Sequence, residues 1–347
     1  MKNKSILLKT SFFLVLILLF AYTKKESLVS GINLKNMDTK VNPGDNFYDY
    51  VNGTWLKNNK IPSDKAYYGS STLINDKAQE DVKAIIENAS KGKFAYGSDE
   101  QKIGDFYEAY MDTINREKIG IAPLLPEFKK INAISNYSDL AGYFGYANSI
   151  GFNTPLAIGI TVDFKDPNQY MLYTWQSGLG LPDREYYILE DDKSKEIRKK
   201  YVTHIAKMLQ LGGVENSSEL APKIMALETT LAGKHMKKEE TRDMVKLYNK
   251  YEIKDLNTLM PDFNWSLMFK NAGIINQKNI TVTQIEYIKS LSSIIKTTSL
   301  NTWKAYLKWS TIDNSAKYLN AALDIENFEF KGKTLWGMKK QVPMWRR

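Results

Sequence analysis

Histidine, cysteine and paired acidic side chains could hold a metal or activate a nucleophile, and this 347-residue sequence contains few of them. The absence of cysteine excludes disulfides, thiolate metal sites and cysteine nucleophiles. The only histidines are His204 and His235. Serines such as Ser70 lack the glycine-rich turn of a hydrolase nucleophile. Acid pairs such as Glu239-Glu240 are typical of solvated loops or helix starts, so we expect no catalytic residue.

A metal site built on the two histidines is the first alternative to weigh. His235 and Glu239 are four positions apart, so a helix there would place two possible ligands on one face. Lysines and Arg242 crowd this segment and oppose a divalent cation. His204 lies within an apolar helical pattern, which is typical of a packed or surface histidine. We therefore expect no metal site and no cofactor in this chain.

Composition and charge narrow the class of protein. The hydrophobic content of 43% suits a globular protein with an ample core. The formal net charge is +9, which raises nucleic acid as a partner. The basic residues are scattered and mixed with acidic ones, so we expect no nucleic-acid binding.

The first 25 residues have the composition of a targeting segment. Lysines precede the apolar run Phe12–Ala21, which is shorter than the ~20 residues of a membrane span, and no clear cleavage site follows. We expect residues 1–25 to be a signal peptide or N-terminal anchor with weak membrane association. The expected location is the cell envelope, exported, either periplasmic or membrane-anchored and outward facing. Residues 26–40 are interpreted as a connector and 41–347 as one domain.

Apolar residues recurring every three or four positions predict a mainly α protein. The helices are expected at 73–89, 98–114, 138–150, 182–188, 194–211, 217–231, 281–295, 300–309 and 316–328. One stretch has the period of a strand instead, because Leu156, Ile158, Ile160 and Val162 alternate with small residues. A turn at 165–168 leads into a second strand, so one small β-hairpin is expected at about 155–175.

In two stretches the order of the residues is more informative than their composition. The stretch 42–62 reads NPGDNFYDYVNGTWLKNNKIP: a turn, a helix capped by Asp45 or Asn46, and Gly53 as its expected end. The stretch 178–188 reads GLGLPDREYYI, a glycine-containing loop that leads into a helix. Within it, Arg184 is expected to fix the loop to a neighbouring helix through an ion pair.

The order of these motifs resembles the N-terminal region of the neprilysin and endothelin-converting-enzyme family of zinc metallopeptidases. The resemblance runs from about Gly31 to Arg347. The residues that carry it are interpreted as a structural signature, with no substrate-binding role assigned: Pro43, Phe47, Tyr48, Tyr50, Gly53, Trp55, Pro62, Gly69, Leu181, Pro182, Arg184, Tyr186, Tyr187 and Trp345.

The resemblance implies a multi-helix N-terminal lobe that encloses the substrate cavity of a zinc metalloendopeptidase. Its relatives bind zinc through a His-Glu-x-x-His helix, which cannot be drawn in this sequence. Zinc is therefore expected only in a catalytic half beyond Arg347, and the chain is interpreted as truncated before it.

No activity is expected from this chain alone. Joined to a catalytic half, which could be separately encoded, it is expected to act on oligopeptides. The alternative is a non-catalytic peptide-binding or interaction module that works without zinc.

Overall fold

The computed structural model describes residues 31–347. The chain divides into two compact units between Ile61 and Pro62. The expected leader, residues 1–25, and the first residues of the 26–40 connector lie outside the described residues. Within 31–347, no helix combines the length and the apolar character that crossing a membrane requires.

The first unit is built on the opening motif. It contains the 3-10 helix η1 (Leu34–Asn36) and the helix α2 (Phe47–Asn58), which the Asn46 side chain caps as expected. The expectation that Gly53 ends this helix was wrong. Gly53 is buried inside α2, where a Cβ atom would lie 2.7 Å from the Asp38 Cβ, so the glycine permits a close approach. Phe47 and Tyr48 remain 67% and 64% exposed.

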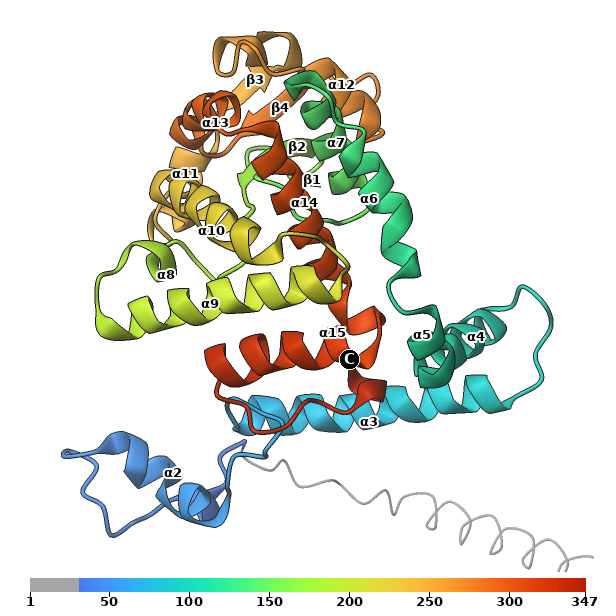
Figure 1. Cartoon of the computed structure of the whole chain (residues 1–347). Helices are drawn as coiled ribbons and strands as arrows, with labels where there is room; N and C mark the ends of the chain where they lie inside the picture. The colour runs from blue at the N-terminus through green and yellow to red at the C-terminus, as the bar shows by residue number, and fades with distance from the viewer. Residues whose placement is uncertain (1–30) are drawn as a thin grey trace, which may run out of the picture. The chain divides into compact units, whose positions relative to one another are not determined.

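The second unit is mainly α (Figure 1), as the sequence predicted. Its α-helices are α3 (Ser70–Lys91), α4 (Asp99–Met111), α5 (Thr113–Ile119), α6 (Leu125–Asn132), α7 (Tyr137–Ser149), α8 (Glu185–Ile188), α9 (Asp192–Leu211), α10 (Ser217–Lys234), α11 (Met244–Leu247), α12 (Trp265–Asn271), α13 (Ile285–Thr297), α14 (Leu300–Ser315) and α15 (Ala321–Asn327). A π-helix, η6 (Phe328–Leu335), follows α15 directly.

The expected hairpin is confirmed as β1 (Leu156–Val162) and β2 (Tyr170–Gln176), which pair antiparallel. It belongs to a larger sheet than the sequence predicted. The strands β3 (Lys250–Glu252) and β4 (Asn279–Val282) complete a four-stranded sheet in the order β1-β2-β4-β3, in which β2 and β4 run parallel. These two strands have three and four residues, too few for an alternating pattern to stand out.

The core of the second unit is organised around α14, which packs on α6, α9 and α10. Trp303, Tyr306 and Trp309 follow one another at three-residue intervals on this helix and are all buried. That spacing keeps the three aromatic side chains on one face, so a single helix supplies much of the apolar surface that its neighbours cover.

Two expected helices are divided in the structure. The helix expected at 98–114 ends at Met111, because the Asp112 side chain accepts the backbone N–H of Asn115 and caps α5. The helix expected at 316–328 begins only at Ala321, where the Asn320 side chain caps it. In both cases a residue within the apolar pattern acts as a cap and starts a new helix.

Candidate functional site

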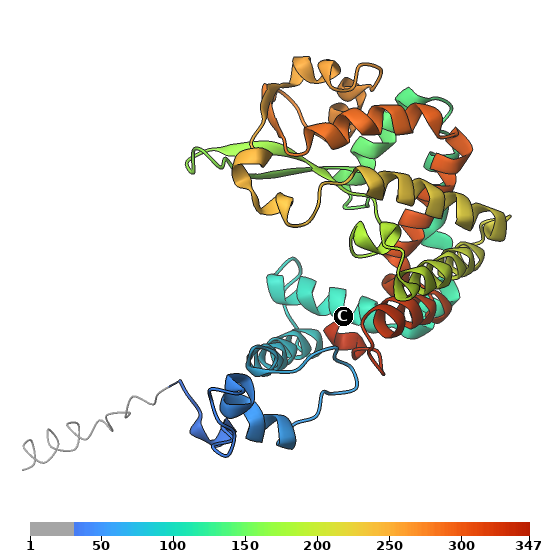
Figure 2. The same cartoon turned by 90° about the vertical axis from the view of Figure 1, so that its left-hand side faces the viewer.

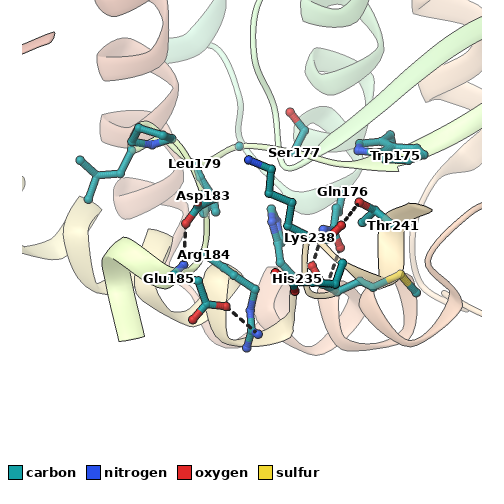
Figure 3. Close-up of a pocket in the computed structure, with 15 residues that line it drawn as sticks. Trp175, Gln176, Ser177, Leu179, Asp183, Arg184, Glu185, His235, Lys238 and Thr241 are labelled. Carbon is teal, nitrogen blue, oxygen red and sulfur yellow. Dashed lines mark hydrogen bonds and ion pairs between the residues drawn. The ribbon is translucent and has the colours of Figure 1, made fainter. Parts of the chain in front are cut away.

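A pocket of about 380 Å³ lies where the end of β2, the loop before α8 and the segment after α10 meet. Figure 3 shows the Lys238 side chain standing between the loop residues Asp183–Glu185 and the strand end at Trp175 and Gln176. Gln176 joins two of these walls, since its side chain accepts the Met236 N–H at 2.7 Å and donates to the Met236 carbonyl at 3.0 Å. The pocket is thus framed by the 178–188 motif.

The motif's glycines are required by its surroundings. Gly178 has a φ of +93°, in the left-handed region, and its carbonyl accepts the Tyr306 hydroxyl at 2.8 Å. Gly180 lies so close to α9 that a Cβ atom would sit 1.9 Å from the Tyr201 hydroxyl oxygen. The Gly-x-Gly pattern therefore lets the backbone pass between buried aromatic side chains.

A buried carboxylate, Glu228 of α10, fixes this loop. Its Oε2 atom accepts the Tyr187 hydroxyl at 2.5 Å, the Tyr201 hydroxyl at 2.8 Å and the Gly180 N–H at 3.1 Å. Its Oε1 atom accepts the Trp309 indole N–H at 3.1 Å. Four donors from the loop, α8, α9 and α14 converge on one side chain, which we call the Glu228 cluster. The cluster ties the pocket's loop to the core.

Tyr187 extends the same network toward the backbone. Its hydroxyl oxygen accepts the N–H groups of Gly180 and Leu181 at 3.1 and 2.9 Å while it donates to Glu228. This geometry explains why a tyrosine stands in the motif, because a phenylalanine would leave two buried N–H groups without this acceptor.

Arg184 holds the loop to α10, but not by the ion pair expected from the sequence. Its Nε donates to the Ala232 carbonyl at 3.2 Å, near the end of that helix. Its ion pair is with the neighbouring Glu185, at 3.2 Å. The Ala232 carbonyl, in the last turn of α10, also accepts the His235 N–H at 3.2 Å, so Arg184 supplies it with a second donor.

His235 lines the pocket as a neutral side chain. Burial, and to a smaller extent the charge of Arg184, lower the pKa of His235 to about 4, against a hydrogen bond with the Ser177 backbone that raises it. Its ring packs edge-on against Tyr287, with centroids 4.8 Å apart. At neutral pH such an imidazole is uncharged and a weak base.

A helix that would place His235 and Glu239 on one face does not form. Helix α10 ends at Lys234, His235 is its C-cap, and the chain then turns into the 3-10 helix η3 (Glu240–Arg242). The two side chains therefore lack the one-turn spacing of paired metal ligands.

These residues do not fit a zinc ion. His204 is packed in the core, where its ring stacks on Phe330 with centroids 4.6 Å apart and its Nδ1 lies 2.9 Å from a Glu326 oxygen. It lines a different pocket from His235. Across residues 31–347, no group of three or more histidine, cysteine, aspartate or glutamate side chains is arranged to hold a metal.

The Glu228 cluster predicts a pH dependence of stability. Burial raises the pKa of Glu228 to about 7 against the lowering effect of its four donors. Between the ordinary value of 4.5 and about 7, the folded protein keeps a proton that the unfolded chain has lost, so stability falls as the pH rises. The free energy of unfolding is expected to fall by about 3 kcal/mol from this group, and the fall is complete above pH 7.

Urea unfolding at a series of pH values measures this contribution as the difference between the wild type and the Glu228→Gln variant. The variant cannot titrate at this position, and all other acids are shared. The prediction would be contradicted if the free energies of unfolding of the wild type and the variant differed by a constant amount from pH 4.5 to 8.

The structure brings together part of the sequence signature. Leu181, Pro182, Arg184, Tyr186 and Tyr187 gather in the loop and α8 beside the pocket. The other members lie elsewhere: Pro43, Phe47, Tyr48, Tyr50, Gly53 and Trp55 in the first unit, Pro62 and Gly69 before α3, and Trp345 in the 3-10 helix η7 (Met344–Arg346).

The sequence analysis did not identify the Glu228 cluster, which holds the loop beside the pocket. A signal was present, because Glu228 follows Leu227 within the apolar stripe formed by Ile224 and Leu231. A carboxylate on the buried face of a helix demands partners. In the sequence, His235 is a possible metal ligand and Lys238 is one of the lysines that oppose a metal ion, and no pattern indicates that both line a pocket.

Comparison with known proteins places these features in a family. A family model described as peptidase family M13 matches residues 43–347, nearly the whole of the described chain. The chain belongs to peptidase family M13. The relatives with matching sequences include endothelin-converting enzyme 1 of Mus musculus, 26% identical over 337 residues and 92% of this chain. Membrane metallo-endopeptidase-like 1 of Mus musculus is 26% identical over 90% of this chain.

Solved structures of M13-type fold agree with this membership. The zinc metalloprotease Zmp1 of Mycobacterium tuberculosis, in complex with an inhibitor, superposes with a TM-score of 0.87 at 32% identity, covering 92% of this chain and 49% of Zmp1. PepO from Lactobacillus rhamnosis has the same fold, with a TM-score of 0.71 at 16% identity. The resemblance inferred from the sequence motifs and the mainly helical fold class are thereby confirmed.

The chain spans less than half the length of the curated relatives that it matches. It covers 43% of endothelin-converting enzyme 1 and 44% of membrane metallo-endopeptidase-like 1, both of Mus musculus. The N-terminal region of M13 peptidases is thus the part that this chain represents.

Proposed function

We propose that this chain is the N-terminal region of an exported, cell-envelope zinc metalloendopeptidase that hydrolyses oligopeptides. The observation that carries the proposal is the fold match to Zmp1, a zinc metalloprotease whose structure was determined with an inhibitor. The match covers 92% of this chain at 32% identity, so the likeness extends to sequence as well as fold.

In this proposal the chain forms the helical lobe that encloses the substrate cavity. Zinc is bound by a further part of the enzyme, since neither His204 nor His235 stands in a set of side chains that fits the metal. The role of the present residues is to build and stiffen that lobe. The Glu228 cluster serves this role by fixing the pocket loop, α8, α9, α10 and α14 to one another.

The expected result is that peptide hydrolysis requires more polypeptide than these 347 residues. The species isolated from its own cells with antibodies against this chain should have an intact mass above 39.8 kDa, or should hold a second chain. That species should cleave internally quenched peptides, lose activity with 1,10-phenanthroline and regain it with added zinc.

The purified 347-residue chain is the matched control and should leave the same peptides intact with or without zinc. Zinc-dependent cleavage by this chain alone would contradict the proposal. So would a native species that holds zinc and does not cleave peptides.

A further inference from the structure

One edge of the sheet is open. Among residues 31–347, strand β1 pairs with β2 alone, and the Ile158 N–H points away from β2, donating to the Asn148 side chain at 3.0 Å. Backbone groups alternate along an antiparallel strand, so the N–H and C=O of Ile160 point to the same open side, together with the Ile158 C=O and the Val162 N–H. Within residues 31–347, no backbone group pairs with these four.

The open edge is also exposed. Gly159–Val162 are solvent-exposed along the strand. Figure 2 shows the β1–β2 hairpin extending away from the helices that cover the rest of the sheet. Asn148 caps the first part of the strand, where its amide also donates to the Leu156 carbonyl at 2.9 Å. The unpaired part therefore begins at Ile158 and ends at Val162.

The two edges of the sheet differ in their protection against pairing with other chains. Strand β3 is three residues long, carries Lys250 and Glu252, and turns directly into the 3-10 helix η4 (Ile253–Thr258). Short length and charge are the usual protection of an edge strand. Strand β1 reads LAIGITV, without a charge or a proline. An edge of this composition is normally covered.

Apolar side chains line one face of the same hairpin. Val162 lies opposite Tyr170, and Ile160 lies opposite Leu172, so these four side chains point to one side. Ile160 is 68% exposed and Tyr170 is 78% exposed. Side chains of an added strand would pack on this surface at every second residue.

We propose that the open edge of β1 binds an extended peptide segment, which adds to the sheet as a further strand. Backbone hydrogen bonds to Ile158, Ile160 and Val162 would hold it, and alternate apolar side chains would rest on Ile160 and Tyr170. The choice of a peptide as ligand rests on the proposed function. The site lies on β1, apart from the pocket beside α8.

The size of the edge favours a short peptide over a second copy of the chain. Five residues of strand span about 17 Å. A stable dimer buries about 800 Å² on each partner, several-fold more than a single strand edge of this length provides. Four backbone groups and a small apolar strip match a peptide of a few residues.

The test is fluorescence anisotropy with the full chain and a fluorescein-labelled peptide of sequence Lys-Thr-Val-Thr-Val-Thr-Lys. We expect saturable binding that Ile160→Pro weakens at least about tenfold, because proline removes the outward N–H and places its ring on the open edge. Ile160→Val keeps the N–H and a branched side chain, so it should change the affinity by less than about twofold. A peptide N-methylated at every threonine and valine lacks the backbone donors of its five central residues and should not bind.

Hydrogen exchange on the unaltered chain gives a second measurement that needs no variant. Peptide binding should slow exchange of the Ile160 and Val162 amides and leave Gly159 and Thr161, which face β2, unchanged. No saturable binding at millimolar peptide, equal binding by Ile160→Pro, or self-association lost in Ile160→Pro without peptide binding would each overturn the proposal. Zinc-dependent hydrolysis is measured separately, so either proposal can fail while the other stands.

Discussion

Replacing Glu228 with alanine is expected to lower the free energy of unfolding by about 3–5 kcal/mol. The carboxylate accepts four hydrogen bonds in the core, and its removal leaves the Tyr187 and Tyr201 hydroxyls, the Gly180 N–H and the Trp309 indole N–H without their acceptor. Each buried donor without a partner costs free energy because its hydrogen bond to water is lost on folding and no hydrogen bond within the protein replaces it. Urea unfolding followed by tryptophan fluorescence measures the loss.

Two matched variants distinguish the loss of these hydrogen bonds from the general effect of removing a negative charge. Glu228→Gln keeps the shape and one carbonyl acceptor, so we expect a smaller loss than for alanine. Glu196→Ala removes an exposed glutamate of α9 that pairs with Lys200, and its unfolding midpoint should match the wild type. Equal midpoints for the wild type and Glu228→Ala would show that the four hydrogen bonds contribute nothing net.

The second large effect is expected for Gly180→Ala, which should destabilise the chain by several kcal/mol or displace the loop beside the pocket. The added Cβ would lie 1.9 Å from the Tyr201 hydroxyl oxygen and 3.4 Å from the Glu228 Oε2. Tyr201 is fully buried and hydrogen-bonded to Glu228, so moving its hydroxyl would disturb the cluster. Either the backbone of the loop or the Glu228 cluster must give way.

Gly233→Ala is the control for this substitution. Gly233 lies in α10, and a Cβ atom there would meet nothing within 4 Å. Alanine favours a helix over glycine, so this variant should be as stable as the wild type or more stable by about 0.5–1 kcal/mol. Urea midpoints of both variants, with near-ultraviolet circular dichroism of the buried aromatics, check the prediction. Gly180→Ala at or above the stability of Gly233→Ala would contradict it.

The long helices were predictable from the sequence because their signals are local. The helix expected at 194–211 is α9 (Asp192–Leu211), and the helix expected from residue 98 begins as α4 directly after Ser98, whose side chain caps it. An apolar stripe, a capping side chain and a terminating glycine act within a few residues of one another. The same holds for β1 and β2, whose alternation and connecting turn lie in one stretch of the chain.

The sequence by itself also determined the family, because motifs in a fixed order mark M13 membership whatever their structural roles. It did not determine what the motif residues do. Asp38 packs against Gly53 inside α2, and Tyr201 of α9 leaves room only for a glycine at position 180. These are contacts between segments far apart in the chain, and no local pattern encodes them.

Tertiary structure alone decided the candidate site. Glu228 is one glutamate among many in the sequence, and its role appears only when α8, α9 and α14 direct Tyr187, Tyr201 and Trp309 at it. The strands β3 and β4 likewise exist because β2 offers β4 a partner. Burial and hydrogen-bond pairing are properties of the packed chain, so they fix the structural role of a residue that composition and periodicity leave open.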